Sequence, residues 1–121
     1  MQKLHIYIVE NNPLIAFALK KMLLNIGHNI CGIAECYNEA VKDLRVMNVD
    51  LVITDIMIKG EENGIDLANY INHHLHIPFI FQSSTTSADI INLANQTHPN
   101  AFLPKPVSKS EMIKALAMIA A

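Results

Sequence analysis

Residues 4–13 read LHIYIVENNP, and they mark the passage from a strand to a helix that is repeated throughout the fold. The apolar, β-branched run up to Val9 predicts a short buried strand. Asn12 and Pro13 then supply an N-cap and a first-turn proline for a helix, which Gly27 is expected to close. The residues expected on its buried stripe are Leu14, Ile15, Ala18, Leu19, Met22, Leu23 and Ile26.

The same strand–helix unit recurs along the chain. Further strands are predicted at residues 30–34, 50–54, 79–81 and 101–103. Helices follow from about residues 38, 65, 86 and 108, the last two opened by the expected capping boxes Thr86 with Asp89 and Ser108 with Glu111. The buried stripe of the last helix is expected to hold Met112, Ile113, Leu116 and Ile119. Five such units predict an α/β, flavodoxin-like (βα)5 three-layer sandwich with a parallel five-stranded sheet of order 2-1-3-4-5.

Length and composition limit the possible functions. The 121 residues suit one domain, residues 1–121, with its own core. A net charge of −2 argues against a basic nucleic-acid-binding face, and 51% hydrophobic residues argue against disorder. Apolar runs are too short for a membrane span, and the N-terminus is not typical of a signal peptide. Cys31 and Cys36 are therefore expected to be reduced thiols in the cytoplasm.

Polar side chains gather at the carboxyl ends of the predicted strands, the edge where open parallel sheets bind ligands. These strand ends carry Glu10-Asn11, Asp55, Ser83-Ser84 and Lys105-Pro106. Carboxylate oxygens bind Mg²⁺, a lysine neutralises phosphoryl oxygens, and a carboxylate can itself accept a phosphoryl group. The set indicates phosphoryl transfer, which depends mainly on positioning and charge neutralisation.

Four segments in this order resemble the receiver domain of two-component response regulators, of the CheY-like superfamily, over essentially the whole chain. They are residues 8–13 (IVENNP), 52–57 (VITDIM), 78–83 (PFIFQS) and 101–106 (AFLPKP). The resemblance implies a cytoplasmic phosphoprotein of phosphorelay signal transduction that forms an aspartyl phosphate and turns over no small molecule. Its implied partners are a sensor histidine kinase or phosphotransfer protein, with a homodimer and a C-terminal effector domain as further options. Direct binding to nucleic acid or membrane is not expected.

The resemblance also implies roles for single residues. Asp55 is expected to be the phosphoacceptor, while the Ser83 hydroxyl and the Lys105 ammonium are expected to bind the phosphoryl group. The Lys105–Pro106 bond is expected to be cis. Phe102 is expected to turn inward as Ser83 moves, which remodels the face made by the fourth helix, fifth strand and fifth helix.

The expected metal is Mg²⁺, and the sequence departs here from the family's usual pattern. The ligands implied by the resemblance are Glu10, Asn11, Asp55 and the backbone carbonyl of Met57. Asn11 stands where the family usually has a second acid, so the acidic positions sum to −2 rather than −3. We therefore expect weaker Mg²⁺ binding and slower phosphorylation. Asn11 could equally cap the first helix. In the loop that follows Asp55, Lys59 replaces the common proline and one extra residue precedes Gly64, so mobility is expected there.

Two other functions stay open at this point. A pseudo-receiver would keep the fold and act as a phosphorylation-independent interaction module, and Asn11 supports that alternative. A flavodoxin-like binder of a nucleotide or flavin would need a Gly/Ser/Thr-rich cradle after the first strand, where this chain has ENNP instead. His73 and His76 lie three residues apart without a nearby Cys or carboxylate, so a solvated helix end is the favoured interpretation.

Overall fold

The structure, a computed structural model, describes residues 2–120. Its strands are β1 (His5–Val9), β2 (Asn29–Ala34), β3 (Leu51–Asp55), β4 (Phe79–Ser83) and β5 (Ala101–Pro104). Its helices are α1 (Pro13–Ile26), α2 (Tyr37–Leu44), α3 (Gly64–Tyr70), the π-helical turn η1 (Ile71–Leu75), α4 (Ala88–Asn95) and α5 (Lys109–Ala120). All neighbouring strands pair in parallel in the order β2-β1-β3-β4-β5, which confirms the predicted topology.

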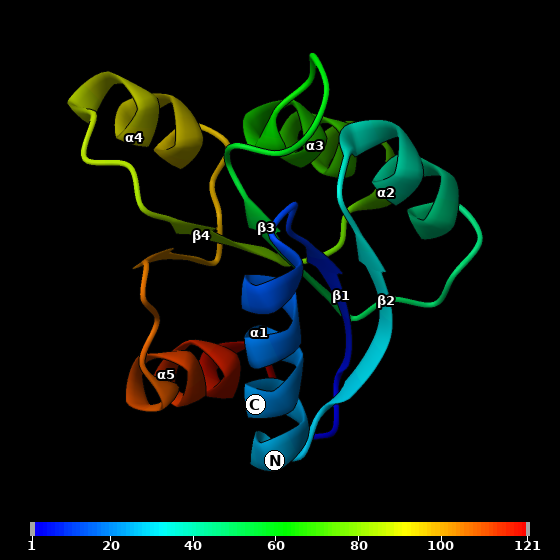
Figure 1. The fold of residues 1–121 in the computed structure, drawn as a ribbon. Coiled ribbons are helices and arrows are strands. Elements are labelled where there is room, and N and C mark those ends of the chain that lie inside the picture. The colour runs from blue at the N-terminus through cyan, green and yellow to red at the C-terminus, as the bar shows by residue number, and fades with distance from the viewer. Residues whose placement is uncertain (1, 121) are drawn as a thin grey trace.

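Helices cover both faces of the sheet (Figure 1). α1 and α5 pack on one face, where Leu19, Leu23, Met112 and Leu116 meet alternate residues of the central strands. α2, α3 and α4 pack on the other face. β3 is buried along its whole length, because both of its faces are covered by helices. No helix among residues 2–120 is long and apolar enough to cross a bilayer.

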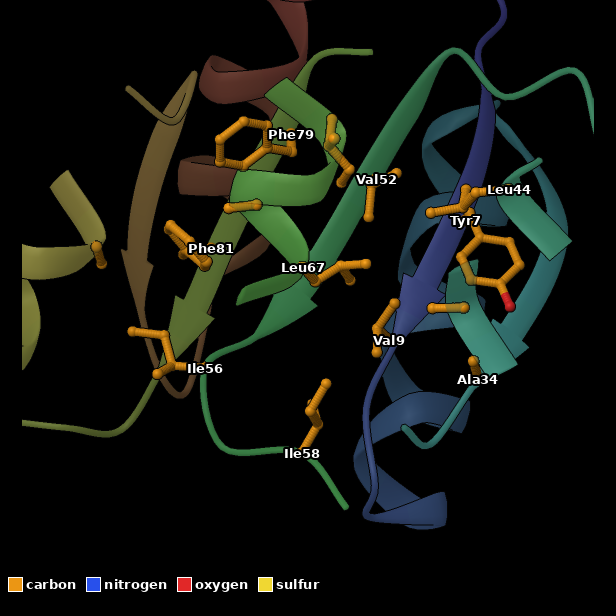
Figure 2. Close-up of a cluster of buried hydrophobic side chains, with 14 residues drawn as sticks. Tyr7, Val9, Ala34, Leu44, Val52, Ile56, Ile58, Leu67, Phe79 and Phe81 are labelled. Atoms are coloured by element: carbon orange, nitrogen blue, oxygen red, sulfur yellow. The ribbon is translucent and has the colours of Figure 1, made fainter. Parts of the chain in front are cut away.

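The core on the α2–α3–α4 face is rich in large side chains (Figure 2). The Phe79 and Phe81 rings of β4 meet edge to face with centroids 5.6 Å apart. Tyr7 of β1 is fully buried, and its hydroxyl donates a 2.7 Å hydrogen bond to Asp43. Burial and this bond raise the pKa of Tyr7. Gly32 of β2 lies against the ring, since an added Cβ would stand 2.6 Å from Tyr7 Cε1.

Helix starts follow the predicted capping chemistry at two places and differ at a third. The Asn12 side chain accepts the N–H groups at the start of α1. Ser108 and Glu111 form the reciprocal box expected before α5. The box expected at Thr86 is wrong: the cap of α4 is Ser87, whose hydroxyl accepts the N–H three residues later at 3.4 Å. A run of hydroxyl residues offers several equivalent caps, so the sequence pattern misplaced the start by one residue.

Two buried stripes are narrower than expected. On α1, Leu14 is 80% exposed and Ile15 and Ala18 are also exposed, while Ala16 turns to the sheet. On α5, Ile113 is exposed as well. The apolar arc of α1 is wider than the strip of the helix that contacts the sheet, so its edge residues lie outside the core.

Candidate functional site

Three charged side chains meet above the carboxyl edge of the sheet. Lys105, after β5, donates from Nζ to Asp55 Oδ2 at 2.6 Å and to Glu10 Oε1 at 2.5 Å. Glu10 follows β1 and Asp55 ends β3, and these strands are neighbours in the sheet. The topology thus joins residues that lie 50 and 95 positions from Lys105 in the sequence. The Lys105–Pro106 bond is cis, as predicted.

The Asp55 carboxylate is fixed on both of its oxygens. Oδ1 accepts the backbone N–H of Ile56 at 2.7 Å and that of Met57 at 3.4 Å. Oδ2 accepts the Lys105 ammonium. Desolvation lowers the pKa of Lys105, but the hydrogen bonds to Asp55 and Glu10 outweigh it, so the pKa of this lysine is raised. A positive charge therefore stays beside Asp55 at neutral pH.

Glu10 is the most deeply buried of the three charged groups, with 1% of its side chain exposed. Its Oε2 accepts the Asn12 N–H at 3.0 Å. Its Oε1 is shared by Lys105 and by the Gln82 amide, whose Nε2 lies 3.5 Å away. Sequence reasoning did not identify Gln82, although an amide directly after the apolar run FIF of a buried strand is a signal that could have found it.

The remaining predicted site residues lie around this cluster. Asn11 is exposed, and it does not cap α1, because that role belongs to Asn12. Ser83 is buried at the end of β4, where its hydroxyl accepts the Thr85 N–H at 3.1 Å. Phe102 is half-buried, and its ring centroid lies 6.0 Å from that of Phe81. The Met57 side chain is 62% exposed. The structure thus brings Glu10, Asp55 and Lys105 into direct contact. Ser83 instead hydrogen-bonds within the loop that follows β4.

The donors available for a metal ion are oxygens, as Mg²⁺ prefers. Asp55 and the exposed amide of Asn11 fit such an ion in kind, while Glu10 is turned to Lys105. Glu10, Asp55 and Lys105 together carry a net charge of −1, which is low for a divalent-cation site. Within residues 2–120, no group of three or more His, Cys, Asp or Glu side chains could hold a metal ion. His73 and His76 are exposed.

The loop after Asp55 is anchored at both ends. The Lys59 N–H donates to the Glu35 carbonyl at 3.0 Å, a bond that the family's usual proline could not make. Lys59 Nζ also pairs with the Glu35 carboxylate at 3.0 Å on the exposed surface. At the other end, Asn63 and Asp66 form a capping box that begins α3.

An apolar cavity of about 520 Å³ lies beside Lys105, between α1 and the segment that leads into α5. Its apolar lining comprises Leu14, Ile15, Ala18, Leu19, Met22, Pro106 and Val107. Gln82, Ser84 and Lys105 supply its polar groups. Five of the seven α1 residues that were predicted to be buried therefore border an opening next to the charged cluster.

Comparison with known proteins gives consistent matches. A family model described as the response regulator receiver domain matches residues 6–117. The transcriptional regulatory protein PdtaR of Mycobacterium tuberculosis is 31% identical over 113 residues, covering 93% of this chain and 55% of that protein. The phyllosphere-induced regulator PhyR of Methylorubrum extorquens is 34% identical over 77 residues, covering 63% of this chain and 29% of that protein. The chain therefore spans about half the length of PdtaR, and less of PhyR.

Solved structures share the fold. The signal receiver domain of a modulated diguanylate cyclase from Desulfovibrio desulfuricans G20 aligns with a TM-score of 0.92 at 25% identity, covering 98% of this chain and 94% of that one. RcsB from Salmonella enterica serovar Typhimurium, solved bound to promoter rprA in the presence of phosphomimetic BeF3⁻, aligns with a TM-score of 0.86. The RcsB match has 22% identity over 94% of this chain and 66% of that one, and it supports the fold alone.

Proposed function

The chain belongs to the response regulator receiver family, and from that premise we propose that residues 1–121 form one phosphoacceptor domain that is phosphorylated on Asp55 by a histidine kinase or phosphotransfer protein. The observation that carries the proposal is the 2.6 Å ion pair between Lys105 Nζ and Asp55 Oδ2. Receiver domains belong to signalling proteins rather than to classical enzymes. The proposed chemistry is accordingly limited to self-phosphorylation and dephosphorylation.

The groups around Asp55 suit a phosphoryl transfer to its carboxylate. In that step a carboxylate oxygen attacks phosphorus, the bond from phosphorus to the donor atom breaks, and the donor leaves with the electron pair. The N–H groups of Ile56 and Met57 orient the carboxylate, and Lys105 neutralises charge on the phosphoryl oxygens. Mg²⁺, when bound, would add further charge neutralisation, held by Asp55, Asn11 and the Met57 carbonyl with Glu10 nearby.

We assign the switch to Ser83 and Phe102. The Ser83 hydroxyl accepts the Thr85 N–H in the loop that leads to α4, so a turn of this hydroxyl toward a phosphoryl group would break that bond and free the loop. Phe102 is half-buried beside Phe81, and in the proposed switch its ring turns further inward when Ser83 moves. The α4–β5–α5 face would then report the charge at Asp55.

The surroundings of the site support a protein phosphodonor. Leu14 and Ile15 are exposed and line the cavity beside Lys105, so these apolar side chains offer contact area to a protein donor that reaches the site. The greater length of PdtaR, of which this chain covers 55%, supports a further effector domain in the whole protein, whereas a homodimer stays a prediction from the family resemblance. The free thiols of Cys31 and Cys36 are consistent with a cytoplasmic location.

One specific feature favours a second candidate function. Asn11 is neutral, and Glu10 is engaged by Lys105 rather than open to a metal ion. A pseudo-receiver that binds partners without phosphorylation would need no more than this arrangement.

Intact-mass measurement after incubation with Mg²⁺ and acetyl phosphate separates the two functions. We expect a phosphoryl-sized adduct on the wild-type chain and none on Asp55→Asn. If the wild type acquires no adduct, even from its cognate kinase, the pseudo-receiver replaces the phosphoacceptor.

A further inference from the structure

Gln82 is a buried amide in a strand that otherwise needs apolar side chains. It is 2% exposed, and its register partner on β3 is Asp55. A buried amide is unfavourable unless its polar atoms find partners. The position therefore calls for a reason beyond packing, and its polar neighbour Glu10 supplies one.

Glu10 depends on few donors. Its Oε1 receives the Lys105 ammonium at 2.5 Å, while the Gln82 Nε2 stands back at 3.5 Å from the same oxygen. The Asn12 N–H satisfies only the other oxygen, Oε2. If Lys105 moved away, Gln82 would be the remaining side-chain donor that the structure places beside Oε1.

Lys105 has to serve two carboxylates and, in the proposed function, a phosphoryl group as well. Phosphoryl oxygens on Asp55 would draw the ammonium outward, away from the deeply buried Glu10. A buried carboxylate that loses its ammonium partner pays the full penalty of desolvation. That penalty would hold Lys105 back unless another donor took its place.

We infer that Gln82 is a positioning residue, whose amide closes on Glu10 Oε1 when Lys105 leaves and so releases Lys105 to the phosphoryl group. The inference rests on the proposed function for the role of Lys105, whereas the link between Gln82 and Glu10 can be tested by itself. Gln82 and Lys105 both line the cavity beside α1, so one side of each residue is not packed against protein atoms. Closing the 3.5 Å gap to a usual hydrogen-bond length needs a shift of only about 0.6 Å.

A thermal double-mutant cycle tests the link without any phosphorylation. Gln82→Met keeps the length of the side chain and removes its N–H donor. Alone it should lower Tm by about 2 °C or less, because a 3.5 Å contact is weak. In Lys105→Met, where Gln82 is the remaining side-chain donor to Glu10, the same change should lower Tm by about 5 °C or more. Gln96→Met, the same substitution at an exposed position, should have equal effects in both backgrounds.

Phosphorylation kinetics test the release of Lys105. Gln82→Met should slow labelling by acetyl phosphate about tenfold at saturating donor, with the half-saturating donor concentration unchanged, because Gln82 does not touch the donor. In a Glu10→Gln background the tenfold effect should disappear. If Lys105→Met fails to fold, the Glu10→Gln background takes its place in the thermal experiment. In that background Gln82→Met should lower Tm by the same amount as Gln96→Met does.

The outcomes are distinguishable. Additive Tm changes overturn the inference, whether or not the wild type is phosphorylated. Coupled Tm changes with an unaltered labelling rate overturn the role in releasing Lys105. A wild type that acquires no phosphoryl group refutes the proposed function, while coupled Tm changes in the same proteins would still support the Gln82–Glu10 link.

Discussion

Asn11→Asp should tighten Mg²⁺ binding, and the charges at the site set the size of the effect. Glu10, Asp55 and Lys105 sum to −1, so the substitution doubles the net negative charge. Asn11 is exposed, and a water-like dielectric is therefore appropriate. At about 4 Å, a divalent ion gains about 2 kcal/mol from one added charge in such a medium. Part of this is lost to salt screening, which leaves an expected gain in affinity of about 5- to 30-fold.

Isothermal titration calorimetry is the suitable assay, because the chain contains no tryptophan whose fluorescence could report binding. Asn92→Asp, an exposed change on α4, controls for net charge alone and should leave the Mg²⁺ affinity near that of the wild type. Without metal, Asn11→Asp should be slightly less stable than the wild type, and added Mg²⁺ should reverse the order of their Tm values. Equal Mg²⁺ affinity in Asn11→Asp and the wild type would refute the reasoning.

Two further predictions concern stability. His28 is buried, and burial lowers its pKa below 6.5. Its Nδ1 accepts the Leu4 N–H at 3.0 Å, while its Nε2 has no partner among the described residues. The native state therefore keeps this imidazole neutral while the unfolded chain takes up a proton, so the free energy of unfolding in urea should fall as pH drops below about 6.5. His28→Leu should flatten that part of the profile, and an unchanged slope would contradict the assignment. Gly32→Ala should destabilise the protein by about 1–3 kcal/mol in the same assay, because its Cβ would stand 2.6 Å from the buried ring of Tyr7, whose hydroxyl is held by Asp43. Tyr7→Leu in the same chain should recover part of the loss, and a Gly32→Ala chain as stable as the wild type would show that the ring can move.

The parts of the fold that repeat could be read from the sequence. Strand–helix alternation, together with the handedness of crossovers, left few topologies, and the observed sheet order is the predicted one. The same logic placed Glu10, Asp55 and Lys105 at one edge, where the structure joins them. Sheet edges are therefore predictable from the order of elements, without knowledge of side-chain conformations.

The features that the sequence did not predict are those for which several local conformations have similar energies. Thr86 and Ser87 could each cap α4, and only the tertiary arrangement decides between them. The exposure of Leu14 depends on how α1 is rotated about its axis, which an apolar arc wider than the interface does not fix. The polarity of Gln82 in a buried strand was a usable signal, but a strand buried on both faces shows no alternation that tells which of its side chains face the site.

The reach of Lys105 across the chain has a consequence for synthesis. Its two carboxylate partners emerge from the ribosome 95 and 50 residues earlier, so a nascent polypeptide carries Glu10 and Asp55 without their shared cation until Lys105 has emerged. Only after the segment following β5 has emerged can Asp55 form its ion pair with Lys105. In the proposed function, competence for phosphorylation is thereby tied to completion of the domain, and an unfinished chain would present a kinase with no assembled target.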